Sequence, residues 1–330
     1  MKRIKFIFLI ICVFVLISCE YSQNNRADTD ITQSKEKEGA EDSAVPFVSD
    51  VSDVSDIFDV FETRRLICKH TDLTEFYNSV QNPREFVLSG GHIYGGIVPH
   101  HLAAATLISG FFKAAADLGE KYDTVVIVAP NHVGATGDII TSFKDWQVWD
   151  NVFCDTDIVE KIYKKRPDGY EITENDDRME EEHAVSVLIP YIKYYLPDAK
   201  VAPFLLNRRL TLETVYNFAK ILSDEINASG KKVLFIGSID FSHYLPISFA
   251  KENDKITEAA ILNKNYRKIQ EFSNEYVDSP QSLNTFLLYL ENMGVNNIEI
   301  LYNSDMSEFY GEGINETTSY FIISAYDIIK

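Results

Sequence analysis

Cysteine is scarce in this chain: four are present among 330 residues, and no two of them form a CxxC pair. That absence argues against the common zinc-binding and thiol-exchange motifs, which need such a pair. The chain also has no internal repeat, no Walker loop and no GxGxxG loop, because the glycines of the segment SGGHIYGG at 89–96 have the wrong spacing. None of the common nucleotide-binding loops is therefore indicated.

Basic residues are few relative to acidic ones. Lysine and arginine number 31 against 50 aspartates and glutamates, and the formal net charge is -19. Residues 1–19 carry three basic residues and no acidic one, so their removal would take the charge from -19 to -22. Such acidity argues against nucleic acid as a partner. It suits a soluble body that stays off an anionic membrane and is held there by a lipid anchor alone.

The first 19 residues have the composition of a secretory signal, with a basic start and an apolar run from Phe6 to Ile17. A retained membrane anchor is the alternative, but this run is shorter than the ~20 residues that a spanning helix needs. The ending Leu16-Ile17-Ser18-Cys19 resembles a bacterial lipobox, which predicts that Cys19 is acylated and becomes the mature N-terminus. We therefore predict an exported lipoprotein, anchored to the bacterial cell membrane on a leaflet that the sequence does not specify.

Residues 20–46 are polar, charged and poor in large apolar side chains. Such a segment cannot bury enough surface to offset the entropy lost on ordering, so we predict a flexible acidic linker. One domain is predicted over 47–330, which is a generous length for a single α/β domain and a short one for two. Two cysteines remain in this domain, and Cys68 and Cys154 either form one disulfide in an oxidising compartment or stay buried as free thiols.

Strand and helix patterns alternate along this domain. Apolar runs predict strands at 86–99, 123–130, 200–206, 232–240, 298–303 and 319–326. Helical periodicity lies at 101–119, 181–196, 211–226 and 248–263. Short continuous apolar runs such as VVIVA and VLFIG are typical of strands covered on both faces. The predicted fold class is α/β: a single layered domain with a central, mainly parallel sheet covered by helices.

Three histidines follow predicted strands: His100 ends GGIVPH, His132 ends TVVIVAPNH, and His243 ends KVLFIGSIDFSH. The carboxyl ends of parallel strands converge on one edge of a sheet, so we expect these side chains to share a site. Imidazole is the commonest transition-metal ligand and a natural acid or base near neutral pH. The pattern predicts a metal-dependent or acid/base site. Strand-ending turns with incidental polar residues are the alternative.

Carboxylates accompany two of the histidines in the sequence. Asp240 precedes His243 by three residues, and the pair offers an oriented general base or a carboxylate-histidine contact. Asp240 could instead be only a turn cap, since aspartate is common in turns. Glu182 and His183 begin a predicted helix, where they either line the cleft or are solvated.

Further polar residues are candidates for lining the cleft. His101 follows His100, Asn131 precedes His132, and Ser242 precedes His243. With Glu182 and His183 they complete the predicted lining, although adjacency predicts that His101 points away from His100. The remaining two histidines, His70 and His92, have no such context, and we expect surface or packing roles for both.

The strand-end motifs resemble those of the Memo family, named for a mediator of cell motility and found in bacteria as AmmeMemoRadiSam system protein B. Family members typically read PHAGY, then GPSHH or GPNH, EHSxExHLPY, SSDFSH or SSDFCH, and a CGxxP-like turn before a helix. The resemblance covers about residues 86 to 326, and the fourth motif is the most specific. In order, this chain has Pro99-His100-His101-Leu102-Ala103, Ala129-Pro130-Asn131-His132-Val133, Glu182-His183-Ala184 running on to Ile189-Pro190-Tyr191, Gly237-Ser238-Ile239-Asp240-Phe241-Ser242-His243, and Val277-Asp278-Ser279-Pro280.

This resemblance implies a fold similar to that of the class III extradiol dioxygenases and a divalent metal, with Fe(II) the first choice. It implies that His100, His132 and Asp278 bind the metal, a set of two imidazoles and one carboxylate that suits non-haem Fe(II). Asp278 aligns with the family's cysteine, and the run Asp278-Ser279-Pro280 is also a good helix start. His243, oriented by Asp240, would move protons on a substrate bound at the metal.

Departures from the family pattern leave two functions open. His101 and its two successors replace Ala-Gly-Tyr of the first motif, and Ser186 and Leu188 replace a glutamate and a histidine of the third. One function is a metal-dependent, dioxygenase-like oxidoreductase. The alternative is a lipoprotein that binds a metal, a small molecule or a peptide without turnover, because one fold hosts many functions. Both leave homo-oligomerisation open, and no partner motif supports a two-metal hydrolase.

Overall fold

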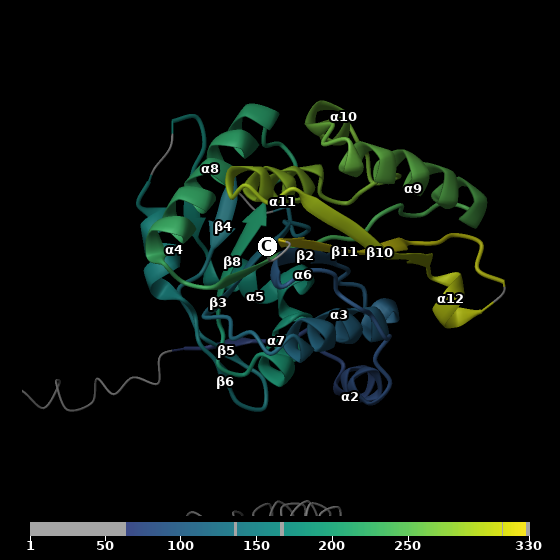
Figure 1. The fold of residues 1–330 in the computed structure, drawn as a ribbon, viewed down its shortest axis with the longest axis horizontal. Coiled ribbons are helices and arrows are strands. Elements are labelled where there is room, and N and C mark those ends of the chain that lie inside the picture. The colour runs from purple at the N-terminus through teal and green to yellow at the C-terminus, as the bar shows by residue number, and fades with distance from the viewer. Residues whose placement is uncertain (1–63, 135–136, 166–167, 312, 328–330) are drawn as a thin grey trace, which may run out of the picture. The chain divides into compact units, whose positions relative to one another are not determined.

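The computed structural model describes residues 64–134, 137–165, 168–311 and 313–327 (Figure 1). These all belong to one of two compact units of the chain, residues 60–330. The predicted signal 1–19 with Cys19, the predicted linker 20–46 and the start of the predicted domain, 47–63, lie outside the described residues. Among the described helices, none is long and apolar enough to cross a membrane.

An eight-stranded sheet forms the centre of this unit. The four central strands, β2, β9, β3 and β8, are parallel neighbours. On the flanks, β11 pairs antiparallel with β2 and with β10, and β4 pairs antiparallel with β8 and parallel with β7. The predicted α/β fold with a mainly parallel central sheet is thus confirmed. The spatial order is β10 (Asn297–Asp305), β11 (Ser319–Asp327), β2 (His92–Val98), β9 (Val233–Ser238), β3 (Thr124–Pro130), β8 (Lys200–Leu206), β4 (Ile139–Thr141) and β7 (Ile172–Glu174).

The central strands are buried on both faces, as their continuous apolar runs predict. In β3, Val126 and Val128 belong to the core on one side of the sheet, whereas Val125, Ile127 and Ala129 belong to the core on the other. This division follows because successive side chains of a strand point to opposite faces. A strand between two cores needs apolar residues at every position.

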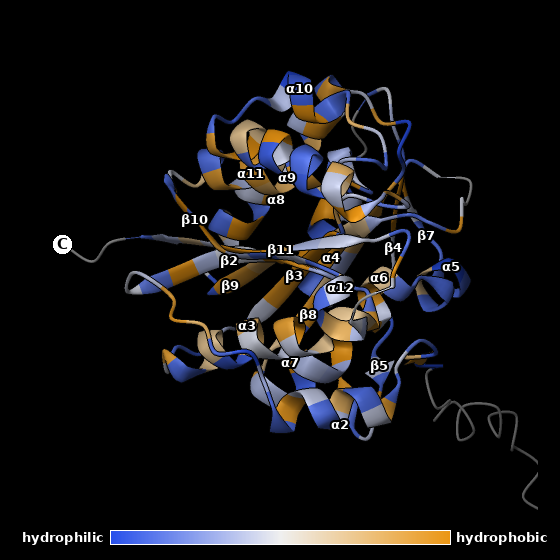
Figure 2. Ribbon diagram, turned by 90° about the vertical axis from the view of Figure 1, so that its right-hand side faces the viewer, coloured by the Kyte–Doolittle hydropathy of each residue, from blue (hydrophilic) through white to orange (hydrophobic). Residues whose placement is uncertain are grey.

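Helices cover both faces of the sheet (Figure 2). One core lies under α4 (Thr156–Tyr163), α8 (Leu212–Ser229), α9 (Ile247–Leu262), α10 (Tyr266–Gln270) and α11 (Pro280–Asn292). The other lies under α2 (Leu73–Gln81), α3 (Ala105–Asp117), α5 (Asp176–Glu181), α6 (His183–Ser186) and α7 (Ile189–Tyr195). A 3-10 helix, η1 (Leu102–Ala104), precedes α3, and α12 (Ser307–Tyr310) follows β10.

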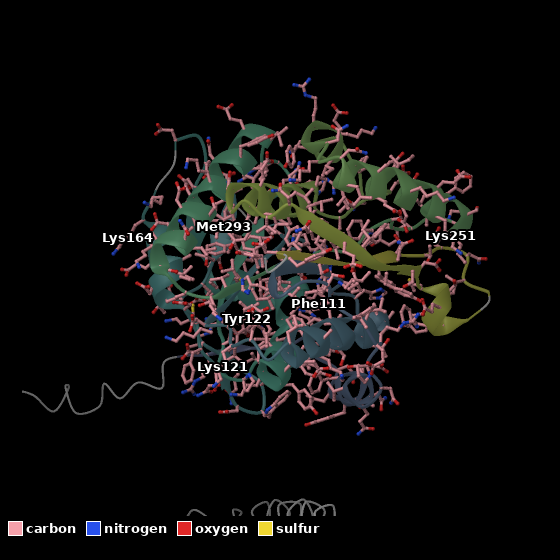
Figure 3. All side chains as sticks on the ribbon, in the orientation of Figure 1. Phe111, Lys121, Tyr122, Lys164, Lys251 and Met293 are labelled. Atoms are coloured by element: carbon pink, nitrogen blue, oxygen red, sulfur yellow. The ribbon has the colours of Figure 1, made fainter. Side chains whose placement is uncertain are left out.

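Apolar and charged side chains separate accordingly (Figure 3). Phe111 of α3 and Tyr122 are buried in the second core. Lys121, Lys164 and Lys251 are largely exposed and extend from the surface. These lysines lie on the solvated surface around the two apolar cores.

A small three-stranded sheet lies beside the second core. It consists of β1 (Leu66–Ile67), β5 (Trp146–Gln147) and β6 (Asn151–Val152). Leu66 is the register partner of Trp146 in the parallel β1–β5 pair, and β5 is joined to β6 by a turn at 148–150. Strands of two residues carry no periodic pattern, so the sequence does not predict them.

The longer elements agree with their predictions, with one exception. The six predicted strands correspond to β2, β3, β8, β9, β10 and β11, and three of the four predicted helices to α3, α8 and α9. The prediction of a single helix over 181–196 is wrong. Glu182 has extended backbone angles, φ -87° and ψ 118°, and its side chain accepts a hydrogen bond from the Ala184 backbone N–H at the start of α6. A separate helix, α7, follows.

Close packing of β2 on its neighbours explains two adjacent glycines. A Cβ at Gly95 would collide with the carbonyl oxygen of Phe235 in β9, and one at Gly96 would collide with the ring of Phe111. Because β2, β9 and β3 are parallel, the segments that follow them leave the sheet at the same edge. This edge carries the candidate site.

Candidate metal centre

Three imidazoles converge at this edge of the sheet. His100 follows β2, His132 follows β3, and His183 begins α6. Each offers one nitrogen, and these three atoms lie within 4.8 Å of one another, close enough to hold a metal ion. His100 is buried, whereas the other two are partly open to solvent. The rings of His132 and His183 are stacked, with centroids 4.5 Å apart.

The hydrogen bonds of His100 determine which ring nitrogen is available. The Ser238 hydroxyl donates to the carbonyl oxygen of Ala184, so its oxygen acts as acceptor for the Nδ1–H of His100, 3.2 Å away. This bond leaves Nε2 of His100 to face the centre of the site. Such an outer partner fixes the tautomer of a ligating imidazole in metalloproteins.

Glu182 orients the other two imidazoles. Its buried carboxylate accepts hydrogen bonds from the backbone N–H of His132 at 2.8 Å and from Nδ1 of the same residue at 2.9 Å. Nδ1 of His183 lies 3.2 Å from the same carboxylate. Burial raises the pKa of Glu182, but its contacts with His132 and His183 outweigh burial and hold that pKa well below its usual range. With both Nδ1 atoms engaged, Nε2 is the nitrogen left on each ring for a cation.

Two buried aspartates face His100. Nε2 of His100 lies 3.3 Å from Oδ2 of Asp278 and 3.5 Å from Oδ2 of Asp240, whose other oxygen accepts from the His100 backbone N–H. Oδ2 of Asp278 is also 3.7 Å from Nε2 of His132. Burial lowers the pKa of His100, but the Asp240 and Asp278 carboxylates outweigh burial and raise that pKa to about 9.

The position of Asp278 is set by the backbone. An isolated antiparallel bridge joins Phe241 to Val277, and the backbone N–H of Asp240 donates to Oδ2 of Asp278. Ser279, not Asp278, caps α11, since its hydroxyl accepts from the backbone N–H of Ser282. The Asp278 side chain is therefore directed into the site and does not cap the helix.

A divalent cation fits this set of donors. Oδ1 of Asp278 is buried and has no hydrogen-bond partner among the described residues, which is uncommon for a buried carboxylate oxygen. Three imidazole nitrogens lie together, and Oδ2 of Asp278 is within 3.7 Å of Nε2 of His100 and of His132. Imidazole and carboxylate both suit first-row metals. Two ligand sets are therefore candidates: the three histidines, or His100 and His132 with Asp278. His100 and His132 belong to both sets.

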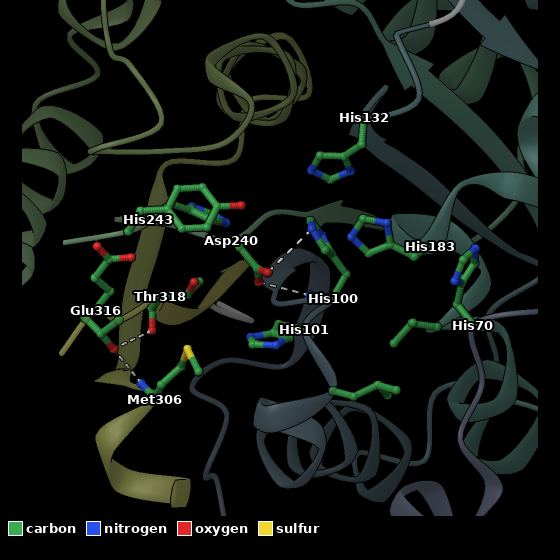
Figure 4. A pocket seen from close by; sticks show the side chains of 14 residues that line it. His70, His100, His101, His132, His183, Asp240, His243, Met306, Glu316 and Thr318 are labelled. Carbon is green, nitrogen blue, oxygen red and sulfur yellow. Dashed lines mark hydrogen bonds and ion pairs between the residues drawn. The ribbon is translucent and has the colours of Figure 1, made fainter. Parts of the chain in front are cut away.

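The centre opens into a pocket of about 690 Å³ (Figure 4). His243, Met306, Glu316 and Thr318 lie on the side opposite His132 and His183. Six of the seven histidines of the chain line this pocket. Its full lining comprises His70, His100, His101, Leu102, His132, His183, Val187, Asp240, His243, Tyr244, Met306, Glu316, Thr317 and Thr318.

His243 reaches the pocket but differs from its expected environment. Asp240 contacts the backbone and ring of His100, and it makes no hydrogen bond with His243 among the interactions seen in the described residues. Nδ1 of His243 is buried and has no partner within the described part of the chain. Its neighbour Ser242 instead donates to Asp254, behind the pocket wall. The expectation that Asp240 orients His243 is therefore replaced by a contact between Asp240 and His100.

The other predicted lining residues divide into two groups. His101 and His183 line the pocket, and His101 hydrogen-bonds through Nδ1 to the hydroxyl of Tyr320 at 2.7 Å. His101 thus shares the pocket with His100, contrary to the expectation that it points elsewhere. Among the described residues, Asn131, Glu182 and Ser242 do not belong to the pocket wall.

Sequence reasoning missed His70. Its ring lies 5.8 Å from that of His183 between centroids, and its Nε2 is 3.0 Å from the carbonyl oxygen of Glu181. His70 is exposed, in agreement with the expected surface or packing role, but it also lines the pocket. The strand before it, β1, has only two residues and carries no periodic pattern, so no local signal in the sequence could have found this role. His92 pairs with Glu120 away from the pocket, in agreement with its expected packing role.

The two cysteines of the described residues are free thiols. Burial raises the pKa of Cys68 to about 12, and burial also raises the pKa of Cys154. Thiols in such surroundings are poor nucleophiles. The sequence left open a disulfide between Cys68 and Cys154 or two free thiols, and the structure has the free thiols.

Fold and site together define a class: an α/β protein whose strand-end imidazoles border a pocket and can hold a metal ion. The family model described as Memo-like protein matches residues 70–311. The chain therefore belongs to the Memo-like protein family, as its motifs predict.

Similar proteins include archaeal members of this family. A MEMO1 family protein of Pyrobaculum aerophilum is 26% identical over 244 residues, covering 72% of this chain and 85% of the relative. One from Methanosarcina barkeri is 28% identical over 238 residues, covering 71% and 82%. An uncharacterized protein from Escherichia coli K12 aligns in its crystal structure with a TM-score of 0.48 and 9% identity, over 72% of this chain and 100% of that one.

Proposed function

We propose that this protein is a membrane-anchored metalloprotein that binds a small molecule beside a strand-end metal and acts on it as a dioxygenase-like oxidoreductase. The observation that carries the proposal is the convergence of three imidazoles, whose ligand nitrogens lie within 4.8 Å of one another and whose Nδ1 atoms each have an outer partner, which leaves Nε2 for a cation. Outer hydrogen bonds that fix the tautomer and orientation of imidazoles are typical of histidines that bind a metal.

His100 and His132 would hold the metal, with Asp278 as the third ligand. Two imidazoles and one carboxylate are the set that suits Fe(II), and a bound Fe(II) would supply open coordination positions for substrate and oxygen. His183 would then remain a neighbour of the metal. The assignment of Asp278 as a ligand is supported by its Oδ1 atom, which is buried and has no hydrogen-bond partner among the described residues.

The remaining pocket residues would bind and orient the substrate. Leu102 and Val187 contribute apolar surface, and Glu316 with Thr317 contributes polar groups at the opposite wall. His243 lines the pocket with a ring that can hold or accept a proton from a phenolic hydroxyl. A small aromatic alcohol is the substrate class that this combination suits.

A second function is favoured by one observation. Nδ1 of His243 is buried and lacks a hydrogen-bond partner in the described residues, so no carboxylate orients this ring as it would for an efficient general base. The alternative is therefore a protein that binds a metal together with a small molecule or a peptide and performs no turnover on it.

Asp278 and His243 should show different phenotypes when each is replaced. Asp278→Ala should weaken metal binding, because it removes charge and a ligand oxygen from the centre. His243→Ala should keep the metal and lower oxygen-dependent turnover of phenolic compounds by roughly 10²- to 10⁴-fold, the usual contribution of a general acid or base. Metal content by elemental analysis of protein purified without oxygen, together with oxygen uptake, measures both.

His183→Ala serves as the comparison for Asp278→Ala. If Asp278→Ala keeps its metal and His183→Ala loses it, then the third ligand is His183 and not Asp278. Absence of any oxygen-dependent reaction across phenolic substrates, with metal bound, would favour the binding protein.

Anchoring should depend on Cys19. Cys19→Ser should release the protein from membranes or stall its processing, because the thiol is the proposed acylation point. Fractionation of cells into membrane and soluble parts measures this outcome, with Cys68→Ser as the control that leaves anchoring unchanged. A Cys19→Ser protein that still partitions with lipid in processed form would contradict the lipoprotein proposal.

A further inference from the structure

Three exposed aromatic side chains gather around one buried ring on the face formed by α2, α7 and the β5–β6 turn. The ring is Phe76 of α2. Its centroid lies 5.4 Å from that of Tyr77, 5.2 Å from that of Trp149 and 5.9 Å from that of Tyr194. Leu73, in the first turn of α2, is exposed as well. Leu73, Tyr77, Trp149 and Tyr194 are called the aromatic face below.

This face is unusually apolar for an exposed surface. Trp149 is 47% exposed, Tyr77 49% and Tyr194 50%. Single exposed apolar residues are common on soluble proteins, but a contiguous group marks an interaction site. Their contacts with Phe76 hold the rings in place, so the face is preformed and little conformational freedom is left to lose on binding.

Charged groups border the aromatic face, and two of them form an ion pair. Asp150, the neighbour of Trp149 in the turn, forms an ion pair of 2.8 Å with Lys193, the neighbour of Tyr194 in α7. Lys193 also donates to the carbonyl oxygen of Asn151. Asp72, the N-cap of α2, and Glu75 in its first turn are both exposed and add two carboxylates to this border. The aromatic rings themselves carry no charge, so the contact with lipid that this face can make runs through the rings and not through the charged border.

The aromatic face lies where the chain enters the described fold. The first described strand, β1, pairs with β5 through Leu66 and Trp146, and Trp149 follows only three residues after Trp146. The segment between the proposed lipid attachment at Cys19 and Arg64 therefore joins the fold next to this face. The side of the fold nearest to the anchor, along the chain, is the side that carries the exposed tryptophan.

We propose that the aromatic face docks onto the lipid bilayer, with Trp149, Tyr77 and Tyr194 at the level of the headgroups. The proposal rests on the lipid anchor, which brings the protein to the membrane; the face then sets its orientation there. Tryptophan and tyrosine favour this interface because each has an apolar ring and a polar group that remains hydrated. A tryptophan at a turn and a tyrosine on each of two helices form three points, enough to define a plane.

The chain offers a direct reporter, since it contains two tryptophans in contrasting places. Trp146 is fully buried, and Trp149 is the half-exposed member of the aromatic face. The full-length, lipid-modified protein would be reconstituted in vesicles of phosphatidylcholine and phosphatidylglycerol, with and without brominated phosphatidylcholine. Bromine quenches tryptophan only at short range. We expect brominated lipid to remove a large share of the emission of the parent protein and to leave Trp149→Phe, which retains only Trp146, almost unquenched.

Two further variants test whether quenching depends on the whole face. Tyr77→Ser combined with Tyr194→Ser should reduce quenching of Trp149 several-fold, whereas Phe249→Ser, at a residue of α9 that is 59% exposed, should leave it unchanged. Far-ultraviolet circular dichroism verifies that each variant is folded. Equal, weak quenching of the parent and Trp149→Phe would overturn the proposal.

Sedimentation of the same samples with vesicles separates this proposal from the anchor. Protein that sediments without quenching of Trp149 is anchored but does not dock, which overturns the docking proposal alone. Protein that stays in the supernatant would contradict the proposed lipid anchor. If excess brominated vesicles also fail to quench Trp149 of that protein, the docking proposal is contradicted as well. The aromatic face could also bind a second copy of the chain. Such self-association would appear without lipid as a concentration-dependent blue shift of the tryptophan emission that the double tyrosine variant abolishes. This result would assign the face to a second copy and overturn the membrane-docking proposal.

Discussion

Replacing His100 with alanine should lower the metal affinity of the protein by more than the roughly 10- to 100-fold that is lost when only an outer hydrogen-bond partner of a ligand is removed. His100 is the buried imidazole of the group and faces the Asp278 carboxylate, so its replacement removes a ligand from the centre of the site. Titration of the metal-free protein with Fe(II) or with a spectroscopically visible substitute such as Co(II) measures the affinity.

The matched control for this variant lies on the same strand. His92 begins β2 and pairs with Glu120, whereas His100 follows the other end of β2. His92→Ala should therefore leave metal affinity unchanged. Because alanine at position 100 leaves two buried aspartates facing each other, thermal unfolding must show that the variant is folded. His132→Ala, at a partly exposed ring, is the second variant, and equal metal affinity in all three folded variants would argue against a metal centre.

The sequence predicted the scaffold of this site well because the relevant signals are local. The runs VVIVA and VLFIG predict β3 and β9 as doubly covered strands, and the residues just after them, His132 and Asp240, must leave the sheet at one edge. Parallel pairing then brings together residues that are more than a hundred positions apart. The convergence of His100 and His132 needs no more than this topology.

The contacts made by the carboxylates could not be predicted in the same way. Asp240 is three residues from His243 in the sequence but contacts His100, since the bridge between Phe241 and Val277 turns this loop toward β2 and Asp278. His70 reaches the pocket from a segment before the first long strand. Such pairings depend on side-chain directions in the folded loops, which no periodicity specifies.

Glu182 is the clearest case of a residue whose role appears only in three dimensions. Its extended backbone interrupts what the sequence presents as one helix, and this interruption places a buried carboxylate under two imidazoles. The same carboxylate caps α6, since it accepts a hydrogen bond from the backbone N–H of Ala184. Capping of α6 and orientation of His132 and His183 are thus performed by one side chain.

Glu182→Gln should weaken metal affinity by roughly 10- to 100-fold, the range found for outer partners of metal ligands. The carboxylate accepts hydrogen bonds with both oxygens, from His132, from His183 and from Ala184, whereas glutamine has one acceptor oxygen and would place an amide N–H against another N–H. A buried donor without an acceptor costs about 1–3 kcal/mol, so the free energy of unfolding should fall by about that amount as well.

Glu180→Gln separates the effect on the metal from the effect on stability. Glu180 is also buried, two residues before Glu182, but it pairs with Lys69 and Arg64 and does not line the pocket formed by the described residues. Its replacement should lower stability without altering metal affinity. If Glu182→Gln lowers the free energy of unfolding and leaves metal affinity equal to that of Glu180→Gln, then the carboxylate serves only the helix cap. A selective loss of metal affinity in Glu182→Gln would instead show that it holds the ligand imidazoles in their binding orientation.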